Sequence, residues 1–408
     1  MDNTKEIGPV AAGKRHVVLD ALRGFALLGI CLANFPEFSL YSFLPDSARS
    51  EMPTAAADRL VYYLEYIFVD GKFYTIFSLL FGIGFSIILS NAMEKGANGF
   101  RIFYRRMVVL TIIGLLHLML LWSGDILMLY AVMGMLLPLF RNVGDKKLIV
   151  SALLFLVLPI VVDAAVQLTG VRPSAALVGL QWKYCGIYGI TEENFAYWLS
   201  DAKDYKGVLQ FLVQGAFERM QEFVDGNRYF KVFGLFLLGF WIGRNKLYAN
   251  LGERKNVLRK IAVWGYCVGL PLSLLYAYSA MNGRPWGLAM HSVLYFVSVF
   301  PLSFAYIATF CLCFLHRPQW CGFQWLSAPG RMALSNYIGQ SVWGIVLFYG
   351  VGFGLGTQLG ISRVVAIAAC VYVVQSAFSR LWLLFFRFGP LEWLWRMLTY
   401  GKTFRLRK

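Results

Sequence analysis

One histidine lies deep in an apolar run and is the strongest candidate for proton chemistry. His117 follows Arg106 by eleven residues, which on a helix is about 16 Å, near the middle of a hydrocarbon core roughly 30 Å thick. An imidazole at that depth is a candidate general base or proton relay. The alternative is a neutral imidazole that hydrogen-bonds neighbouring helices to one another.

Asp125 follows His117 by eight residues and raises the question of a His–Asp pair. On a straight helix eight residues span about 12 Å, which is too far for a hydrogen bond. The two side chains meet only if Gly124 breaks the helix and turns Asp125 back. We therefore expect Asp125 to cap the N-terminus of the following helix, with binding of an acceptor as the alternative role.

Two polar side chains share one face of the first apolar segment. Arg23 and Asn34 are eleven residues apart, which leaves only about 20° between them around a helix. Arg23 lies just inside the expected cytoplasmic boundary, within reach of a phosphate group from that side. Asp20 precedes Arg23 by three residues, so an internal Asp20–Arg23 ion pair is the alternative.

Five further polar residues are candidate binding groups. Arg105 and Arg106 offer a platform for an anionic ligand on the inner side, although topology alone also explains basic residues there. Lys72 precedes the second apolar run, where snorkelling to the interface is the expected behaviour and substrate binding the alternative. Glu222 and Asn227 end an outer segment, where they could face an acceptor.

The amino-acid composition indicates that these residues are positioned within a lipid bilayer. Of 408 residues, 58% are hydrophobic and 15% are charged, whereas soluble domains have about 25% charged residues. We predict an all-α transmembrane helix bundle forming a single membrane domain over residues 1–408. Apolar runs long enough to be spans occur at roughly 17–36, 73–91, 107–123, 126–140, 148–168, 229–243, 261–281, 291–315, 332–354 and 364–386.

Lys and Arg residues set the expected orientation of these ten spans. Most basic residues fall in alternate connecting segments, which places both chain ends in the cytoplasm and the protein in the plasma (inner) membrane as a multi-pass protein. The same distribution accounts for the net charge of +16 without nucleic-acid binding. Residues 169–228 then form a long outer loop whose end, 208–224, is expected to be an amphipathic helix. Residues 387–408 form a cytoplasmic interfacial tail.

The cysteines predict neither a disulfide framework nor a metal centre. Most of the seven lie in apolar runs or inner segments, where disulfides do not form. Cys311 and Cys313 lack the spacing of a zinc site. Sequence motifs of common soluble active sites are also absent, which excludes those sites but not catalysis.

Four motifs carry a family resemblance. They are Leu19-Asp20-Ala21-Leu22-Arg23-Gly24-Phe25-Ala26 through Asn34, Lys72-Phe73-Tyr74-Thr75-Ile76-Phe77-Ser78-Leu79-Leu80-Phe81-Gly82, the run from Gly114 to Tyr130, and Gly389-Pro390-Leu391-Glu392-Trp393-Leu394-Trp395-Arg396. In this order they resemble the YeiB-like family, domain of unknown function 418. The opening is also similar to heparan-glucosaminide N-acetyltransferases and to the acyltransferase 3 family, which has histidine where this chain has Asn34.

The resemblance implies a transmembrane acyltransferase that uses cytoplasmic acyl-CoA as co-substrate. The CoA phosphates would rest on Arg23, Arg105 and Arg106. His117 would act as base or carry the acyl group, and Asn34 would stabilise the oxyanion or position the acceptor. The acceptor would be a glycan, lipid or small molecule, and a homodimer is allowed. The alternatives are a transporter or lipid-handling protein without covalent chemistry, and a structural or sensory membrane protein.

Overall fold

The protein is helical throughout the part of the chain that the structure describes. The computed structural model describes residues 16–94 and 98–408, where it contains helices and no β-sheet. The predicted all-α bundle is therefore confirmed. Its helices are α1 (Val17–Phe38), α2 (Asp46–Ser50), α3 (Ala55–Phe68), α4 (Lys72–Glu94), α5 (Gly99–Leu120), α6 (Leu127–Gly134), α7 (Asp145–Thr169), α8 (Ala175–Tyr188), α9 (Trp198–Asp201), α10 (Tyr205–Asp225), α11 (Arg228–Arg244), α12 (Lys255–Met281), α13 (Gly287–His316), α14 (Cys321–Arg331), α15 (Ala333–Phe348), α16 (Ile361–Phe385) and α17 (Pro390–Tyr400).

Within the described residues, seven helical segments are long and apolar enough to cross a membrane. They are α1, α3 joined to α4, α5, α7, α12 with the short turn before it, α13 and α16. The expected spans at 126–140, 229–243 and 332–354 correspond to shorter helices of 8, 17 and 16 residues, namely α6, α11 and α15. Since about 20 residues cross a hydrocarbon core, the count of ten spans stays a prediction.

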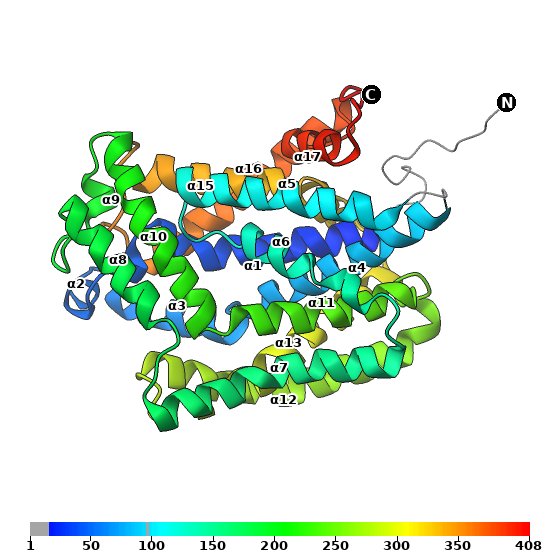
Figure 1. The fold of residues 1–408 in the computed structure, drawn as a ribbon, viewed down its shortest axis with the longest axis horizontal. Coiled ribbons are helices and arrows are strands. Elements are labelled where there is room, and N and C mark those ends of the chain that lie inside the picture. The colour runs from blue at the N-terminus through cyan, green and yellow to red at the C-terminus, as the bar shows by residue number, and fades with distance from the viewer. Residues whose placement is uncertain (1–15, 95–97) are drawn as a thin grey trace.

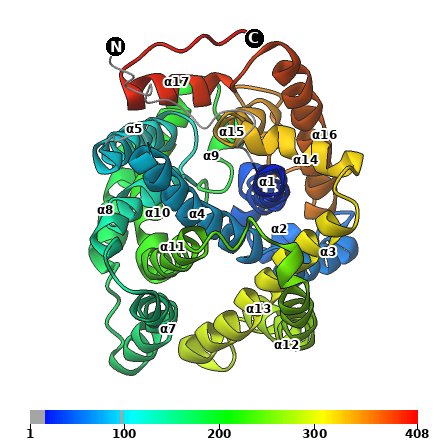
Figure 2. The same ribbon diagram turned by 90° about the vertical axis from the view of Figure 1, so that its right-hand side faces the viewer.

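Helix α1 lies near the middle of the bundle (Figure 2), in contact with α4, α14, α15 and α16. Its small residues allow these close approaches. A Cβ on Gly24 would lie 1.9 Å from the carbonyl oxygen of Leu326, and a Cβ on Gly330 would lie 1.8 Å from the carbonyl oxygen of Asp20. The backbones of α1 and α14 therefore touch, which fixes the depth of Arg23 and Asn34 in the bundle.

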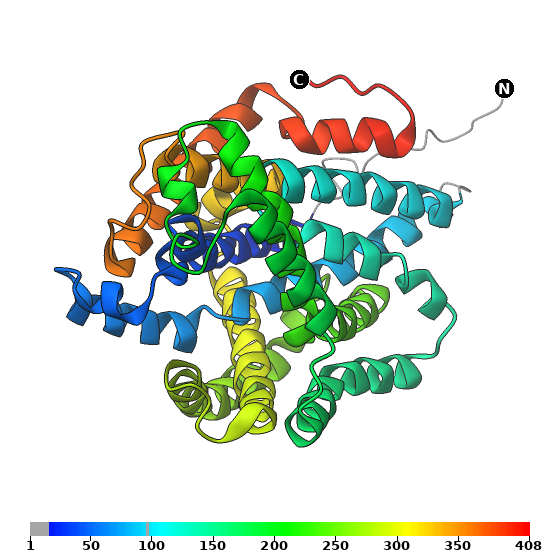
Figure 3. The same cartoon turned by 60° about the vertical axis from the view of Figure 1, so that its left-hand side comes forward.

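The two ends of the bundle differ in what covers them (Figure 1). The start of α1 lies toward the end that carries α17, and we call this the inner end because the basic residues predict it to be cytoplasmic. Helices α8, α9 and α10 cover the opposite, outer end, as Figure 3 also shows. The segment expected to hold an amphipathic helix at 208–224 forms α10, which buries Val208, Phe211, Leu212, Gly215, Arg219 and Phe223 at helical spacing.

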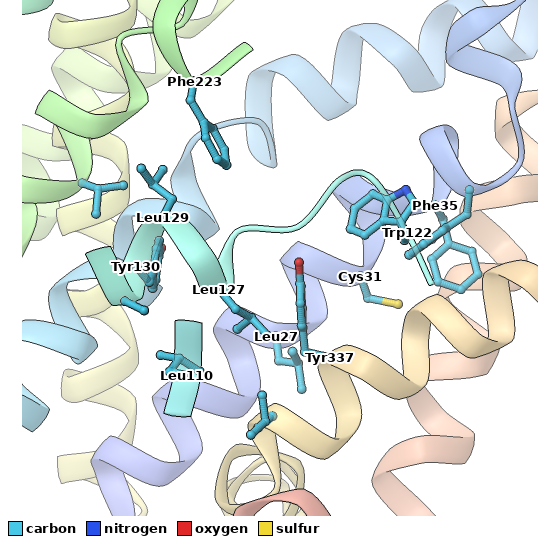
Figure 4. Close-up of a cluster of buried hydrophobic side chains, with 14 of the residues drawn as sticks. Leu27, Cys31, Phe35, Leu110, Trp122, Leu127, Leu129, Tyr130, Phe223 and Tyr337 are labelled. Carbon is cyan, nitrogen blue, oxygen red and sulfur yellow. The ribbon is translucent and has the colours of Figure 1, made fainter. Parts of the chain in front are cut away.

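An irregular connection between α5 and α6 lies at the centre of the largest apolar cluster (Figure 4). Helix α5 ends at Leu120, and residues 121–126 run without helical structure to α6. Trp122 in this connection packs on Phe38 of α1, with ring centroids 4.3 Å apart. On the other side Gly215 of α10 comes so close that a Cβ there would lie 2.6 Å from that of Ser123. Packing on both sides therefore holds this connection in place.

Candidate functional site

A large cavity of about 1110 Å³ has lining residues from both ends of the bundle. Its inner lining includes His16, Asp20, Arg23, Arg106, Lys246, Arg331, Trp395 and Arg396. Its outer lining includes Glu37, Asp70, Asp163, Arg219, Glu222, Arg228, Lys231, Arg284 and His291. Between them lie mainly apolar and aromatic side chains, among them Leu27, Ile30, Phe77, Phe81, Leu110 and Tyr130. A volume of this size accommodates a substantial small molecule.

The inner end of the cavity presents guanidinium groups held by neighbouring side chains. Arg23 donates from Nη1 to Asp20 Oδ1 at 2.8 Å, so the Asp20–Arg23 pair considered from the sequence is present. The guanidinium of Arg106 lies 3.6 Å from the centre of the Trp395 indole ring, a cation–π arrangement. Trp395 in turn donates from Nε1 to the carbonyl oxygen of Arg106 at 3.0 Å. Both arginines line the cavity with their positions fixed.

Arg105 does not join this group, contrary to the platform suggested by its position beside Arg106. Its Nη2 donates to the carbonyl oxygen of Leu398 in α17 at 3.2 Å, and the residue is exposed and absent from the cavity lining. Adjacent helical residues point about 100° apart, so only one of the two arginines can face the cavity. Arg105 instead anchors α17.

Asn34 and Glu37 face the cavity from the outer half of α1. They are three residues apart and therefore neighbours on one helical face. Glu37 was not among the residues predicted from the sequence, although an acidic side chain at the end of an apolar run was a visible signal. Glu222, Arg219 and Arg228 line the same cavity as Glu37, and their charges act on its carboxylate.

Glu222 forms the centre of a charged cluster at the outer end. Its Oε2 accepts a hydrogen bond from Arg219 Nη1 and lies 3.8 Å from Arg228 Nη2. Burial opposes ionisation of Glu222, but the charges of Arg219 and Arg228 hold its pKa below the ordinary value. Glu222, Arg219 and Arg228 all line the cavity, so a carboxylate and two guanidinium groups are available to a ligand there.

His117 and Asp125 form a hydrogen bond, and the expectation that they lie too far apart is wrong. His117 Nδ1 and Asp125 Oδ1 are 2.9 Å apart, with both side chains 1% exposed. The distance along a straight helix does not apply, because α5 ends at Leu120 and the connection turns back. Asp125 Oδ2 also accepts from the backbone N–H of Met128 at 2.8 Å, so the predicted capping of the next helix is confirmed.

The second imidazole nitrogen reaches a residue far away in the sequence. His117 Nε2 lies 2.8 Å from Ser341 Oγ of α15, and Ser341 is fully buried. Neither His117, Asp125 nor Ser341 is part of the cavity lining. Tyr337, one turn before Ser341, does line the cavity, and its ring centroid is 5.3 Å from that of His117. The imidazole therefore lies behind the cavity wall, in contact with the lining residue Tyr337.

The last two candidates, Lys72 and Asn227, are buried and are not part of the cavity lining. Lys72 is 0% exposed, and its Nζ donates to the carbonyl oxygen of Tyr66 at 2.7 Å. Snorkelling to the interface is therefore wrong, because the ammonium group of Lys72 contacts the end of α3 and lies 5.3 Å from the centre of the Tyr276 ring of α12. Asn227 donates from Nδ2 to Asp163 Oδ1 at 2.7 Å and is also buried. Among the described residues the cavity lining includes neither, whereas Asp163 is part of it.

Sequence reasoning missed Arg219 and Ser341, for different reasons. Arg219 sits on the apolar face of α10 three residues before Glu222, so an arginine out of place on an amphipathic helix was a usable signal. Ser341 had none, because serine is common in apolar helices and its partner is 224 residues distant in the chain.

Comparison with known proteins gives one family model and several full-length relatives. The family model described as "Protein of unknown function (DUF418)" matches residues 242–402. The chain is 30% identical over 413 residues to "Uncharacterized protein YxaH" of Bacillus subtilis (strain 168), covering 96% of each chain.

Two other relatives are similar over the same extent. One is the "Uncharacterized 39.9 kDa protein in amylase 3'region" of Bacillus acidopullulyticus, 31% identical over 401 residues and 97% of each chain. The other is "Uncharacterized protein YeiB" of Escherichia coli (strain K12), 28% identical over 407 residues, which is 95% of this chain and 96% of the relative.

Proposed function

This chain belongs to the YeiB-like DUF418 family, and from that premise we propose that it is a transmembrane acyltransferase. It moves an acyl group from acyl-CoA at the inner end of the bundle to an acceptor at the outer end. The observation that carries the proposal is this cavity, whose lining includes Arg23 and Arg106 at the inner end and Glu37 and Glu222 at the outer end. A donor bound on one side and an acceptor on the other would meet inside it.

The inner end fits the chemistry of a CoA nucleotide. Its phosphates need cationic hydrogen-bond donors, and guanidinium groups supply them in a planar fork. Arg23 and Arg106 are fixed there by Asp20 and by the Trp395 ring, so little side-chain freedom is lost on binding. The apolar middle of the cavity, which includes Leu27, Phe77 and Leu110, suits the pantetheine arm and the acyl chain.

The acceptor would bind at the outer end, against Glu37, Glu222 and Arg228. These side chains can accept and donate hydrogen bonds, so they orient a hydroxyl or amine group. Asn34 lies one turn deeper on α1, where its side-chain amide can donate to the oxyanion that forms at the thioester carbonyl. Attack by the acceptor forms the new acyl bond, breaks the thioester and releases CoA as a thiol.

A transporter or lipid-handling protein is the second candidate, favoured by the extent of the cavity between the two ends. In that reading the same polar residues line a permeation path, with His117 behind its wall and not in the lining. Counterflow of a labelled solute in liposomes, with no requirement for CoA, would support transport and contradict acyl transfer.

Thioester cleavage and CoA binding test the proposal. Purified protein in nanodiscs should bind CoA and release free thiol from acyl-CoA, with candidate glycans or lipids added as acceptors. We expect Arg106→Gln to weaken CoA binding about tenfold, which is about 1.4 kcal/mol. Arg105→Gln is the matched control, because its side chain points to Leu398, and CoA binding should stay within about twofold.

Two outcomes would contradict acyl transfer. The first is the absence of CoA binding in a protein whose cooperative thermal unfolding transition shows that it is folded. The second is equal weakening of CoA binding by Arg105→Gln and Arg106→Gln, since that would reflect general surface charge rather than the cavity.

A further inference from the structure

We infer that Asp125, His117 and Ser341 form a nucleophilic triad, in which Ser341 carries the acyl group between donor and acceptor. This inference rests on the proposed function and adds a covalent acyl-enzyme step to it. The carboxylate contacts Nδ1 of the imidazole at 2.9 Å, and the hydroxyl contacts Nε2 at 2.8 Å. This is the order of contacts by which a carboxylate orients an imidazole and the imidazole activates a serine.

The hydrogen bond of Ser341 runs between helices, as that of Ser279 Oγ to His291 Nδ1 also does, whereas three other hydroxyl groups have a bond within their own helix. Ser78, Thr111 and Ser303 each donate to the carbonyl oxygen four residues earlier in their own helix. That local bond is the usual way for a serine or threonine to be satisfied in an apolar helix. Ser341 instead makes its hydrogen bond to His117 on another helix. Its hydroxyl is thus directed at a group that can remove its proton.

Hydrogen bonds to both its side chain and its backbone hold Asp125 in place. Its Oδ2 accepts from the N–H of Met128, and its backbone oxygen accepts from Arg219 Nε at 2.9 Å. Arg219 also donates to the carbonyl oxygen of Gly124. A carboxylate buried in a membrane protein is costly and marks a functional site by default. Here it is fixed in a geometry that keeps the proton of the neutral imidazole on Nδ1 and Nε2 free to accept.

The triad lies one residue layer behind the cavity wall. Gly124 and Ile126, on either side of Asp125, line the cavity, as does Tyr337, which precedes Ser341 by one turn. Figure 4 shows the Tyr337 side chain pointing toward the connection that follows Trp122. The Tyr337 ring contacts the His117 ring, so its rotation would open a path from the cavity to Ser341. Tyr337 is therefore the gate to the nucleophile in this proposal.

The acyl group is transferred in two steps, first to Ser341 and then to the acceptor. Ser341 Oγ attacks the thioester carbonyl while its proton passes to His117 Nε2, and collapse breaks the C–S bond. The thiolate takes that proton and leaves as CoA thiol, with an ester on Ser341. The acceptor hydroxyl or amine then gives its proton to His117 and attacks the ester. Ser341 regains the proton as the acyl group leaves on the acceptor.

A fluorophosphonate probe tests the nucleophile independently of any acyl donor. We expect full-length protein in nanodiscs to form a covalent adduct on Ser341, located by mass spectrometry of the peptide. Ser341→Ala should lose the adduct, and His117→Ala should slow its formation at least tenfold. Tyr337→Ala should speed it severalfold by opening the path. Ser303→Ala is the matched control, since its hydroxyl bonds within its own helix, and labelling should not change.

The results separate this inference from the proposed function. Absence of an adduct on Ser341 in both the wild type and Tyr337→Ala would overturn the triad, as would equal labelling in His117→Ala. If the protein cleaves acyl-CoA but Ser341→Ala retains full turnover, the triad is wrong while acyl transfer stands. If Ser341 is labelled in a His117-dependent way without cleavage of any acyl-CoA, the nucleophile stands and the donor assignment fails.

Discussion

Arg219 donates from Nε to the backbone carbonyl oxygen of Asp125 at 2.9 Å, across 94 residues of sequence. The same guanidinium donates to the carbonyl oxygen of Gly124 and to Glu222. The outer helix α10 therefore holds the connection between α5 and α6 in the position at which Asp125 reaches His117. The outer segment is part of the site and not only a cover for it.

We expect Arg219→Gln to destabilise the protein by about 3 kcal/mol, because it leaves two carbonyl oxygens without their donor and removes the buried partner of the half-exposed Glu222. Thermal unfolding in detergent measures the change. Lys206→Gln is the control on the same helix, since Lys206 is exposed, and it should leave the unfolding temperature nearly unchanged. Equal unfolding temperatures for the two variants would show that Arg219 does not hold the connection.

Glu218, one residue before Arg219, predicts a pH dependence of stability. Burial, followed by the charges of Glu222 and Glu37, raises the pKa of Glu218 to about 8 from 4.5. Between these values the folded protein binds the proton more tightly than the unfolded chain does. The stability that this proton provides is complete below pH 4.5 and is lost as the pH rises to about 8.

Glu218→Gln should remove this pH dependence. The variant should gain stability relative to wild type as the pH rises from about 5 to 8, and the gain should then level off. Denaturation midpoints across this range measure it, with the exposed Glu192→Gln as control. A difference between Glu218→Gln and wild type that is independent of pH would contradict the shifted pKa.

The sequence predicted those parts of the structure that depend on local pattern. Apolar run lengths located the helices, and the three-residue spacing of Asp20 and Arg23 indicated their ion pair. The capping role of Asp125 also followed from its place before an apolar run. Each of these features is set by residues within a few positions of one another.

The parts that failed depend on contacts between distant segments. The His117–Asp125 bond exists because α5 ends at Leu120 and Arg219 holds the following connection, neither of which is visible in the spacing of the two residues. Lys72 is buried because it lies against α12, with its Nζ 5.3 Å from the centre of the Tyr276 ring, while the same Nζ donates to the carbonyl oxygen of Tyr66 in the preceding helix. From local sequence alone, Lys72 was expected to reach the membrane interface, and His117 and Asp125 were expected to be separated by the length of a straight helix.

The contact between α1 and α14 predicts a large effect of one methyl group. A Cβ on Gly24 would lie 1.9 Å from the carbonyl oxygen of Leu326, so Gly24→Ala must push the two helices apart. We expect a loss of about 3 kcal/mol or more in unfolding free energy, and weaker CoA binding because Arg23 moves with α1.

Gly179→Ala is the matched control for this substitution. Nothing lies within 4 Å of a Cβ at Gly179, which is exposed within α8. Alanine should stabilise that helix by about 0.5 to 1 kcal/mol. Thermal unfolding and CoA titration measure both variants. If Gly24→Ala were as stable as Gly179→Ala, the close packing of α1 against α14 would be wrong.

Asp125→Asn separates the orienting role of this residue from its capping role. The asparagine oxygen can still accept from the Met128 N–H, whereas its NH₂ group would face His117 Nδ1 and favour the imidazole with its proton on Nε2. That form donates to Ser341 and cannot take its proton, so fluorophosphonate labelling of Ser341 should fall at least about 100-fold. The unfolding temperature should fall less than in Asp125→Ala, which loses both hydrogen bonds. If labelling in Asp125→Asn matched wild type, Asp125 would serve only as a cap, and the hydrogen bond between His117 and Ser341 would be a contact between helices.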